Sequence, residues 1–317
     1  LSLESILTEL ENKLFNLTNE VKSQKLSTSA ELVNTIFFEL KTKSLNPKLS
    51  GVSSGFYDLD ALTQGFQKSD LIIVAGRPSM GKTSLSLNIA SNVIKNSKLP
   101  VLFFSLEMSK EQIMYKLLSM ETNINQMRLK GGKLYQNDWM KLTKMIKIIS
   151  KFPLFIDDTF NLSIQDIKSK IKTILFEQNE LGLVIIDYIQ LMQTTDFENE
   201  NRVQELSKIT RSLKKIAREF NIPIIGLSQL SRNVENRINK KPILSDLRES
   251  GSIEQDADLV IMLYKNQLAN SSASQPISKT SKSIELIIAK HRNGPTGTVQ
   301  LKFYEEQTKF FNKETNF

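Results

Sequence analysis

The stretch "DLIIVAGRPSMGKTSLSLNIASNVI", residues 70–94, places a glycine-rich loop between an apolar run and a helical pattern. The loop matches G-x-x-x-x-G-K-[ST] at Gly76, Gly81, Lys82 and Thr83, in the strand-to-helix context that gives this motif its meaning. In such a loop the backbone N–H groups face an anion, the lysine reaches the β and γ phosphates, and the threonine ligates Mg²⁺. We therefore expect a nucleoside triphosphate and Mg²⁺ to bind here. The expected contacts are Gly76, Arg77, Pro78, Ser79, Met80, Gly81, Lys82, Thr83 and Ser84.

The composition is that of a globular protein with a basic charge balance. The 317 residues are 40% hydrophobic, which suffices for a large core, and the formal charge is +8. That charge favours a polyanionic partner, although solvated lysines produce the same balance. The absence of cysteine and the single His291 exclude disulfides, thiolate metal sites and histidine clusters. The longest apolar stretch, residues 181–192, is too short to span a bilayer, and no leader opens the chain, so we expect no membrane association.

Two short amphipathic helices are predicted in residues 1–49. Residues 3–21 carry apolar side chains every three or four positions. A second helix is signalled by Thr28 and Glu31, which form a capping box pattern, and it ends before Asn46-Pro47. A pair this short cannot bury a sufficient core, so we expect it to dock on its own chain or on a neighbouring copy.

Residues 50–317 have the pattern of an α/β domain. Continuous apolar runs alternate with helical patterns, and this predicts a largely parallel sheet with helices on both faces. The runs are "LIIVA", "VLFFSLE", "PLFID", "LVIID", "IPIIGLSQ", "LVIMLY" and "SIELIIAK". Residues 266–283 are polar and Ser-rich without periodicity, so we expect a loop there.

Polar residues end three of these runs. Ligands in doubly wound sheets sit beyond the carboxyl ends of the strands. Asp187 is a carboxylate suited to Mg²⁺, Glu107 can orient or deprotonate water, and Gln229 is a neutral donor that can contact a γ-phosphate. Each one alone could be a solvated strand end or a helix cap, but their joint placement around one P-loop favours a hydrolase.

A fourth run ends in "AKHRNGPTG", residues 289–297. Side chains alternate along a strand, so Lys290 and Arg292 should project to one side and His291 to the other. Two cations with no adjacent carboxylate need an anion, and if that anion is a transferred phosphate, Arg292 is an arginine finger. A solvated basic strand end is the other interpretation of this pattern.

The segment from 231 to 258 suits contact with a phosphodiester chain. Its first half is basic and Asn-rich, and Arg248, Ser250 and Gly251 can supply side-chain and backbone donors. No aromatic residues are interleaved, so base stacking is not indicated. Backbone tracking would be tolerant of sequence and strongly dependent on salt.

Taken in this order, the motifs resemble the C-terminal motor domain of the replicative DnaB-type DNA helicases. The resemblance runs from "GVSSGFYDLDALTQGFQKSDLIIVAGRPSMGKT" through "SLEMS", "LVIIDYIQLM", "LSQLSR" and "LRESGSIEQDAD" to "AKHRNGPTG". It implies a RecA-like P-loop NTPase fold, a ring of six subunits, and ATP hydrolysis coupled to movement on single-stranded DNA. It also implies that residues 1–49 are linker helices to a separate N-terminal domain, and that 50–317 are the motor.

The resemblance assigns a role to each candidate at the ATP site. Lys82 and Thr83 are similar to the phosphate and Mg²⁺ contacts, and Glu107 to the catalytic glutamate. Asp187 is similar to the Walker B aspartate and Gln229 to the γ-phosphate sensor. The expected cofactors are therefore ATP and Mg²⁺.

The remaining candidates are implied to act between subunits and on DNA. Lys290 and Arg292 are similar to the pair that each subunit donates to its neighbour's ATP. Arg248, Glu249 and Gly251 match the loop that family members place against the DNA backbone.

The leading hypothesis is an ATP-dependent helicase of the replication fork, with 5′-to-3′ polarity implied by the resemblance. A RecA-like recombination or repair ATPase and an ATP-gated assembly module are the alternatives, and only the motif set favours the helicase. Primase and loader contacts are expected through parts outside this chain. The bias toward Lys, Asn and Ile leaves bacterial cytoplasm and plastid stroma open, with a slight lean to the plastid.

Overall fold

The structure is a computed structural model that describes Leu10 and residues 28–45, 49–192, 202–237, 239–265 and 281–313. It divides into two compact units, Leu1–Lys48 and Leu49–Phe317.

The first unit contains helix α2 (Ser29–Leu45). The predicted capping box is confirmed, because the Thr28 N–H donates to Glu31 Oε2 at 3.1 Å and the Glu31 N–H donates to Thr28 Oγ1 at 3.3 Å. The helix carries apolar side chains that are each at least half exposed, namely Leu32, Val33, Ile36, Phe37, Phe38 and Leu40. The helix predicted for residues 3–21 lies outside the described residues except for Leu10.

The second unit is built on a sheet whose strand order is β3-β2-β4-β5-β1-β6-β7-β8-β9. The parallel strands are β1 (Leu71–Gly76), β2 (Val101–Ser105), β3 (Leu154–Asp157), β4 (Leu183–Asp187), β5 (Ile224–Gln229) and β6 (Leu259–Lys265). The antiparallel extension consists of β7 (Ser281–His291), β8 (Gly297–Tyr304) and β9 (Lys309–Asn312).

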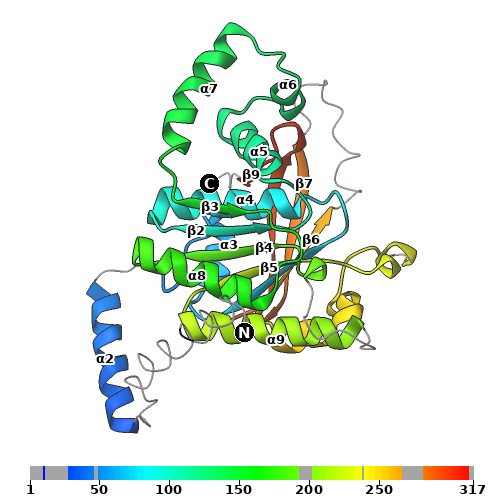
Figure 1. Ribbon diagram of the computed structural model, residues 1–317. Helices are drawn as coiled ribbons and strands as arrows, with labels where there is room; N and C mark the ends of the chain where they lie inside the picture. Colours follow the sequence, from blue (N-terminus) through cyan, green and yellow to red (C-terminus); the bar gives the residue numbers. More distant parts are fainter. Residues whose placement is uncertain are drawn as a thin grey trace. The chain divides into compact units, whose positions relative to one another are not determined.

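Both faces of the parallel strands are covered, which explains their uninterrupted apolar runs. In β1, Ile72 and Val74 belong to the core on one face together with Leu85 of α4 (Lys82–Ser97). Ile73 faces the other way, into a core that includes Leu213 of α9 (Arg202–Phe220). α8 (Ile164–Gln178) contributes to that second core, and α9 lies below the sheet in the view of Figure 1.

Three helices follow β2 and rise away from the sheet at the top of Figure 1: α5 (Lys110–Thr122), α6 (Gln126–Lys130) and α7 (Gln136–Ile149). The remaining helical segments are α3 (Tyr57–Thr63), α10 (Gly251–Asp256), and the 3₁₀ turns η1 (Ile189–Leu191), η2 (Arg232–Asn236), η3 (Leu244–Ser250) and η5 (Glu305–Gln307). Among the described residues, none of these helices combines the length and the apolar character needed to cross a bilayer.

The predicted α/β fold is confirmed, and each of the seven predicted runs forms one of the strands β1–β7. Three details differ from the prediction. β8 and β9 were not predicted, β7 runs antiparallel to β6, and residues 281–283 of the expected loop form the start of β7. The other residues of that loop, 266–280, lie outside the described part of the chain.

Candidate active site

The glycine-rich loop joins β1 to α4, with Gly76 as the last residue of the strand and Lys82 as the first of the helix. Gly81 caps the helix with φ 89°, a conformation that L side chains rarely adopt. A Cβ at this position would lie 3.2 Å from Phe310 Cζ and 3.3 Å from Phe303 Cζ, two rings that stack at 4.3 Å. The backbone conformation therefore favours glycine at position 81, and the aromatic pair leaves little room for a side chain there.

A cavity of about 490 Å³ lies over this loop, at the end of the sheet where the parallel strands finish. Below, this is called the carboxyl end of the sheet. Glu107 follows β2 by two residues, and Asp187 and Gln229 are the last residues of β4 and β5. All three side chains line the cavity, together with Pro78, Ser79, Gly81, Lys82, Thr83 and Ser84. The topology thus brings the three polar strand ends to one P-loop.

Burial disfavours the charged forms of Lys82 and Asp187 in this cavity, whereas Glu107 is exposed. Burial is the main cause that raises the pKa of Asp187 to about 6, and the nearby Glu107 adds to it. Burial likewise lowers the pKa of Lys82, whose ammonium donates to the Gly76 carbonyl at 2.9 Å. A phosphate near Lys82 and a cation near Asp187 would each favour the charged form, so the cavity suits an anion and a metal ion together.

The oxygen ligands in this cavity fit Mg²⁺. The Thr83 hydroxyl donates to Asp187 Oδ2 at 2.6 Å, which places two oxygen ligands side by side. Within the described part of the chain, no group of three or more His, Cys, Asp or Glu side chains could hold a metal ion. Mg²⁺ is commonly held by one or two protein oxygens, with water and substrate phosphates completing its shell.

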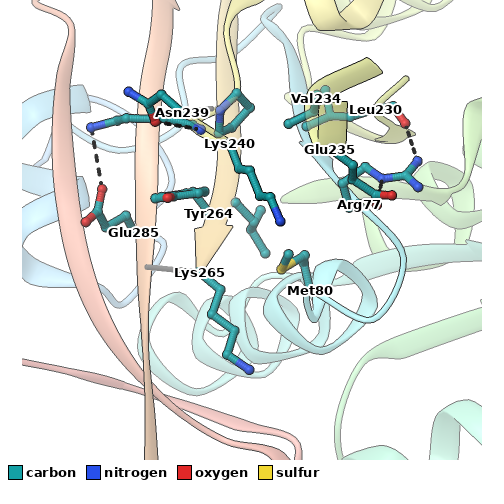
Figure 2. Close-up of a pocket in the computed structure, with 13 residues that line it drawn as sticks. Arg77, Met80, Leu230, Val234, Glu235, Asn239, Lys240, Tyr264, Lys265 and Glu285 are labelled. Carbon is teal, nitrogen blue, oxygen red and sulfur yellow. Dashed lines mark hydrogen bonds and ion pairs between the residues drawn. The ribbon is translucent and has the colours of Figure 1, made fainter. Parts of the chain in front are cut away.

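A second cavity, of about 750 Å³, adjoins the P-loop (Figure 2). Arg77 and Met80 line this cavity and not the first. The Arg77 guanidinium donates to Glu235 at 2.8 Å and to the Leu230 carbonyl at 2.9 Å, so it is directed away from the triphosphate cavity. Of the residues predicted to bind the nucleotide, Arg77, Met80 and Gly76 therefore do not line the first cavity.

Lys290 and Arg292 lie at the opposite end of the sheet. β7 runs antiparallel to β6, with His291 beside Leu259, and Leu259 in turn lies beside Ile72 near the start of β1. This is the end at which the parallel strands begin, called the amino end of the sheet below. The fourth polar run end thus lies away from the P-loop of its own chain, because its strand runs in the other direction.

The pair at the amino end also has partners within its own chain. Arg292 Nη1 lies 3.1 Å from Asp258 Oδ1, and Lys290 Nζ donates to the Glu254 carbonyl at 2.6 Å. The expectation that the two cations lack a neighbouring carboxylate is therefore wrong, because the fold supplies Asp258 from 34 residues away. Both cations donate to carbonyls of α10, whereas His291 Nδ1 lies 3.1 Å from the Pro295 carbonyl, in agreement with the predicted alternation.

Comparison with known proteins gives the family of this site. The model of the DnaB-like helicase C terminal domain matches residues 51–312. The chain belongs to the DnaB-like helicase family. It is 65% identical over 311 residues to a probable replicative DNA helicase of Trieres chinensis, covering 98% of this chain and 68% of that protein. It is 50% identical over 270 residues to replicative DNA helicase DnaB of Geobacillus stearothermophilus, covering 85% and 58%.

Solved structures share the fold of this DnaB-like chain. An ATPase domain solved by itself superposes with a TM-score of 0.82 at 38% identity, covering 92% of this chain and all of that one. A DnaB-like replicative helicase, studied for its interactions with primase, superposes with a TM-score of 0.79 at 36% identity. That match covers 98% of this chain and 72% of the other.

Several residues of the DnaB-like site were not predicted from the sequence. Lys116 of α5 lines the triphosphate cavity, and burial lowers its pKa while Asp187 and Glu107 oppose that shift. The other unpredicted lining residues are Met108, Tyr188, Phe303, Glu305 and Thr308. Nothing in the local sequence distinguishes Lys116 from Lys110, the other lysine of its helix. For Phe303 a sequence signal existed: apolar residues alternate along β8, which is the pattern of a strand with one buried face.

The residues predicted to contact DNA lie on consecutive elements. Arg248 and Glu249 belong to η3, and Gly251 begins α10. Their side chains fall outside the described residues, so their proposed contact with DNA stays a prediction.

Proposed function

We propose that this chain is the motor of an ATP-dependent replicative DNA helicase, and that it works as a ring of copies. One observation carries the proposal: the triphosphate cavity and the Lys290–Arg292 pair lie at opposite ends of one sheet. A single chain therefore cannot bring Arg292 to its own P-loop, whereas neighbouring copies in a ring can share the site. The relatives named as replicative helicases support the helicase over the recombination ATPase and the assembly module.

In this proposal the cavity residues divide the work of ATP hydrolysis. Lys82 and the loop N–H groups hold the β and γ phosphates. Thr83 and Asp187 would hold Mg²⁺, which neutralises phosphate charge when bound. Glu107 accepts a proton from the attacking water or orients it, and Gln229, as a neutral donor, hydrogen-bonds the γ-phosphate.

Lys290 and Arg292 of a neighbouring copy complete the site. Arg292 is about half exposed, although part of its guanidinium is held by Asp258. A guanidinium has five N–H donors, so some remain for a phosphate of the adjoining subunit. Charge on the transferred phosphoryl group is then stabilised only when two copies are in contact, which couples hydrolysis to assembly.

Single-stranded DNA is proposed to lie against Arg248, Glu249 and Gly251, with movement in the 5′-to-3′ direction. Replacing Arg248 with alanine should weaken binding evenly across sequences and reduce the salt slope by about one unit, because one phosphate contact is lost. Titrating fluorescent oligonucleotides at several salt concentrations measures both effects. Lys98→Ala, at an exposed position beyond α4, is the matched control. A loss confined to particular sequences would contradict backbone tracking.

The proposed function is tested by ATP hydrolysis with and without single-stranded DNA, together with unwinding of a forked duplex at two salt concentrations. We expect DNA to stimulate hydrolysis and the fork to be unwound. Stimulation without unwinding would favour the recombinase-like ATPase, and hydrolysis indifferent to DNA would favour the assembly module. The proposed compartment is bacterial cytoplasm or plastid stroma, and primase and loader contacts are proposed to use segments outside this chain.

A further inference from the structure

The Asp258 carboxylate links the Arg292 guanidinium to β1 and α9. Its side chain is only 6% exposed, and its two carboxylate oxygens have different partners. Oδ2 accepts from the Leu71 N–H at 2.9 Å and from the Lys214 ammonium, whereas Oδ1 lies 3.1 Å from Arg292 Nη1. The carboxylate is thus fixed to the start of β1 and to α9 on one side, and it presents its other oxygen to Arg292.

The main chain around Asp258 also holds Arg292 and its neighbour. The Arg292 N–H donates to the Asp258 carbonyl at 2.8 Å, and Arg292 Nη2 donates to the Gln255 carbonyl at 2.7 Å. Lys290 Nζ donates to the carbonyls of Glu254 and Gln255 at 2.6 and 3.2 Å. These carbonyls belong to the last turn of α10, where backbone carbonyls have no intrahelical partner and favour cations.

An arginine held in this way has little freedom to turn. An arginine side chain loses considerable rotamer entropy when it is fixed. Because the hydrogen bonds to Asp258 and Gln255 fix Arg292 in advance, less entropy is left to lose when it meets a phosphate. Two donors of the guanidinium face Asp258 and Gln255, and the side chain remains 48% exposed. The fold therefore presents one side of the guanidinium to solvent while it holds the other.

We propose that Asp258 is a positioning residue for ATP hydrolysis in the neighbouring subunit, because it orients Arg292 toward that subunit's γ-phosphate. The inference rests on the proposed function, in which Arg292 completes a neighbour's site. Asp258 itself touches no nucleotide, so its whole effect on turnover passes through Arg292.

The test is Asp258→Asn in the full chain. We expect ATP affinity to stay as in the wild type and kcat to fall roughly 10- to 100-fold, the loss typical of a misplaced catalytic group. In an Arg292→Ala background, the same substitution should reduce kcat no further. Mixing Asp258→Asn subunits with Lys82→Ala subunits should partly restore turnover, because the second protein supplies a correctly held Arg292 to the intact P-loop of the first.

Asp70→Asn is the matched control, since Asp70 lies 3.9 Å from the same Lys214 but does not pair with Arg292. We expect it to keep wild-type kcat. If Asp258→Asn proves unstable, the paired substitution Asp258→Asn with Lys214→Gln removes one charge of each sign and serves in its place. An unchanged kcat, a further loss in the Arg292→Ala background, or no rescue by Lys82→Ala would overturn the positioning role. If Arg292→Ala is itself not rescued by Lys82→Ala, the failure belongs to the shared site of the proposed function instead.

Discussion

The charged side chains at the two ends of the central sheet differ in how they are paired. At the carboxyl end, Lys82 and Asp187 line an open cavity. Burial lowers the pKa of Lys82 and raises that of Asp187, so it favours the neutral form of both side chains. At the amino end, Asp258 is bonded to both Lys214 and Arg292, and half of Arg292 remains exposed. At the carboxyl end, Lys82 and Asp187 hydrogen-bond neutral groups, and a bound phosphate and metal ion would supply the opposite charges. The amino end holds a paired cation that remains half exposed.

Under the proposed function, this difference divides the work of ATP hydrolysis between copies of the chain. A binding site that already satisfied its own charges would gain little from ATP, and a cation with no anchor would lose entropy on reaching a phosphate. If Arg292 acts at a neighbour's site, as proposed, separating the two over the length of the sheet means that neither end hydrolyses ATP alone. Under this proposal, the direction of β7 is what makes an assembled ring necessary.

The largest effect is expected from removing the lysine of the carboxyl end. Lys82→Ala should reduce ATP turnover below detection, because the β and γ phosphates lose their cation in a buried cavity. Steady-state hydrolysis and nucleotide binding by calorimetry measure this, with the exposed Lys98→Ala as control. Normal hydrolysis in Lys82→Ala would remove the phosphate role from the cavity and with it the comparison between the two ends.

The next effect is expected at the amino end. Arg292→Ala should leave ATP binding intact and reduce kcat by about 10³-fold, the lower bound for loss of an arginine finger. Equal mixtures of Arg292→Ala and Lys82→Ala subunits should recover part of the turnover, because some interfaces then combine an intact P-loop with an intact Arg292. A mixture as inactive as its two parents would show that the ends do not cooperate between copies.

The carboxyl end was largely predictable, because its signals are local. Glycines, a lysine and a threonine at fixed spacing after a buried strand specify the loop. Gly81 has the left-handed backbone of such a turn, and the Phe303 and Phe310 rings lie close to where a Cβ would be. Parallel strands bring their carboxyl ends together, so Glu107, Asp187 and Gln229 could be placed near Lys82 without any knowledge of contacts.

The amino end was not predictable by the same reasoning, because an apolar run does not show whether its strand is parallel or antiparallel to its neighbours. β7 looks like the parallel strands in sequence, yet the segment before it carries no helical pattern, and parallel strands need a crossover that is usually a helix. The turn "NGPTG" between β7 and β8 is a second signal of antiparallel pairing. The Asp258–Arg292 pair and the place of Lys116 depend on packing between distant segments, which no local pattern encodes.

The third prediction is that the buried charge of Asp187 lowers the free energy of unfolding. A pKa of about 6 in the folded protein against 3.8 unfolded means that ionising Asp187 opposes folding, by about 3 kcal/mol once the pH exceeds 6. Asp187→Asn keeps an acceptor for the Thr83 hydroxyl, so it should be more stable than the wild type by up to this amount at pH 7. The gain should fade as the pH drops from 6 to 4, where the wild-type carboxylate becomes protonated.

Urea unfolding without nucleotide or Mg²⁺, between pH 4 and pH 8, measures this difference. Asp158→Asn is the control, because Asp158 is partly exposed and pairs with Lys110 at 3.8 Å. Asp187→Asn should at the same time lose ATP hydrolysis, as befits a residue kept for function at the expense of stability. A variant less stable than the wild type at pH 7 would mean that Asp187 is already well paired, and the contrast between the two ends would weaken.

The smallest effect concerns Lys116, which would add a phosphate contact to those made by the P-loop motif at the carboxyl end. Its ammonium lines the cavity close to Glu107 and Asp187, although burial lowers its pKa. If it bonds a phosphate oxygen, Lys116→Met should raise KM for ATP roughly tenfold, since a hydrogen bond to a charged group contributes about 1.5 kcal/mol. Lys116→Arg should restore most of the affinity, and Lys110→Met, at an exposed position on the same helix, should leave KM unchanged. An unaltered KM in Lys116→Met would show that this lysine balances Glu107 and Asp187 without meeting the nucleotide, so that the P-loop alone holds the phosphates at this end of the sheet.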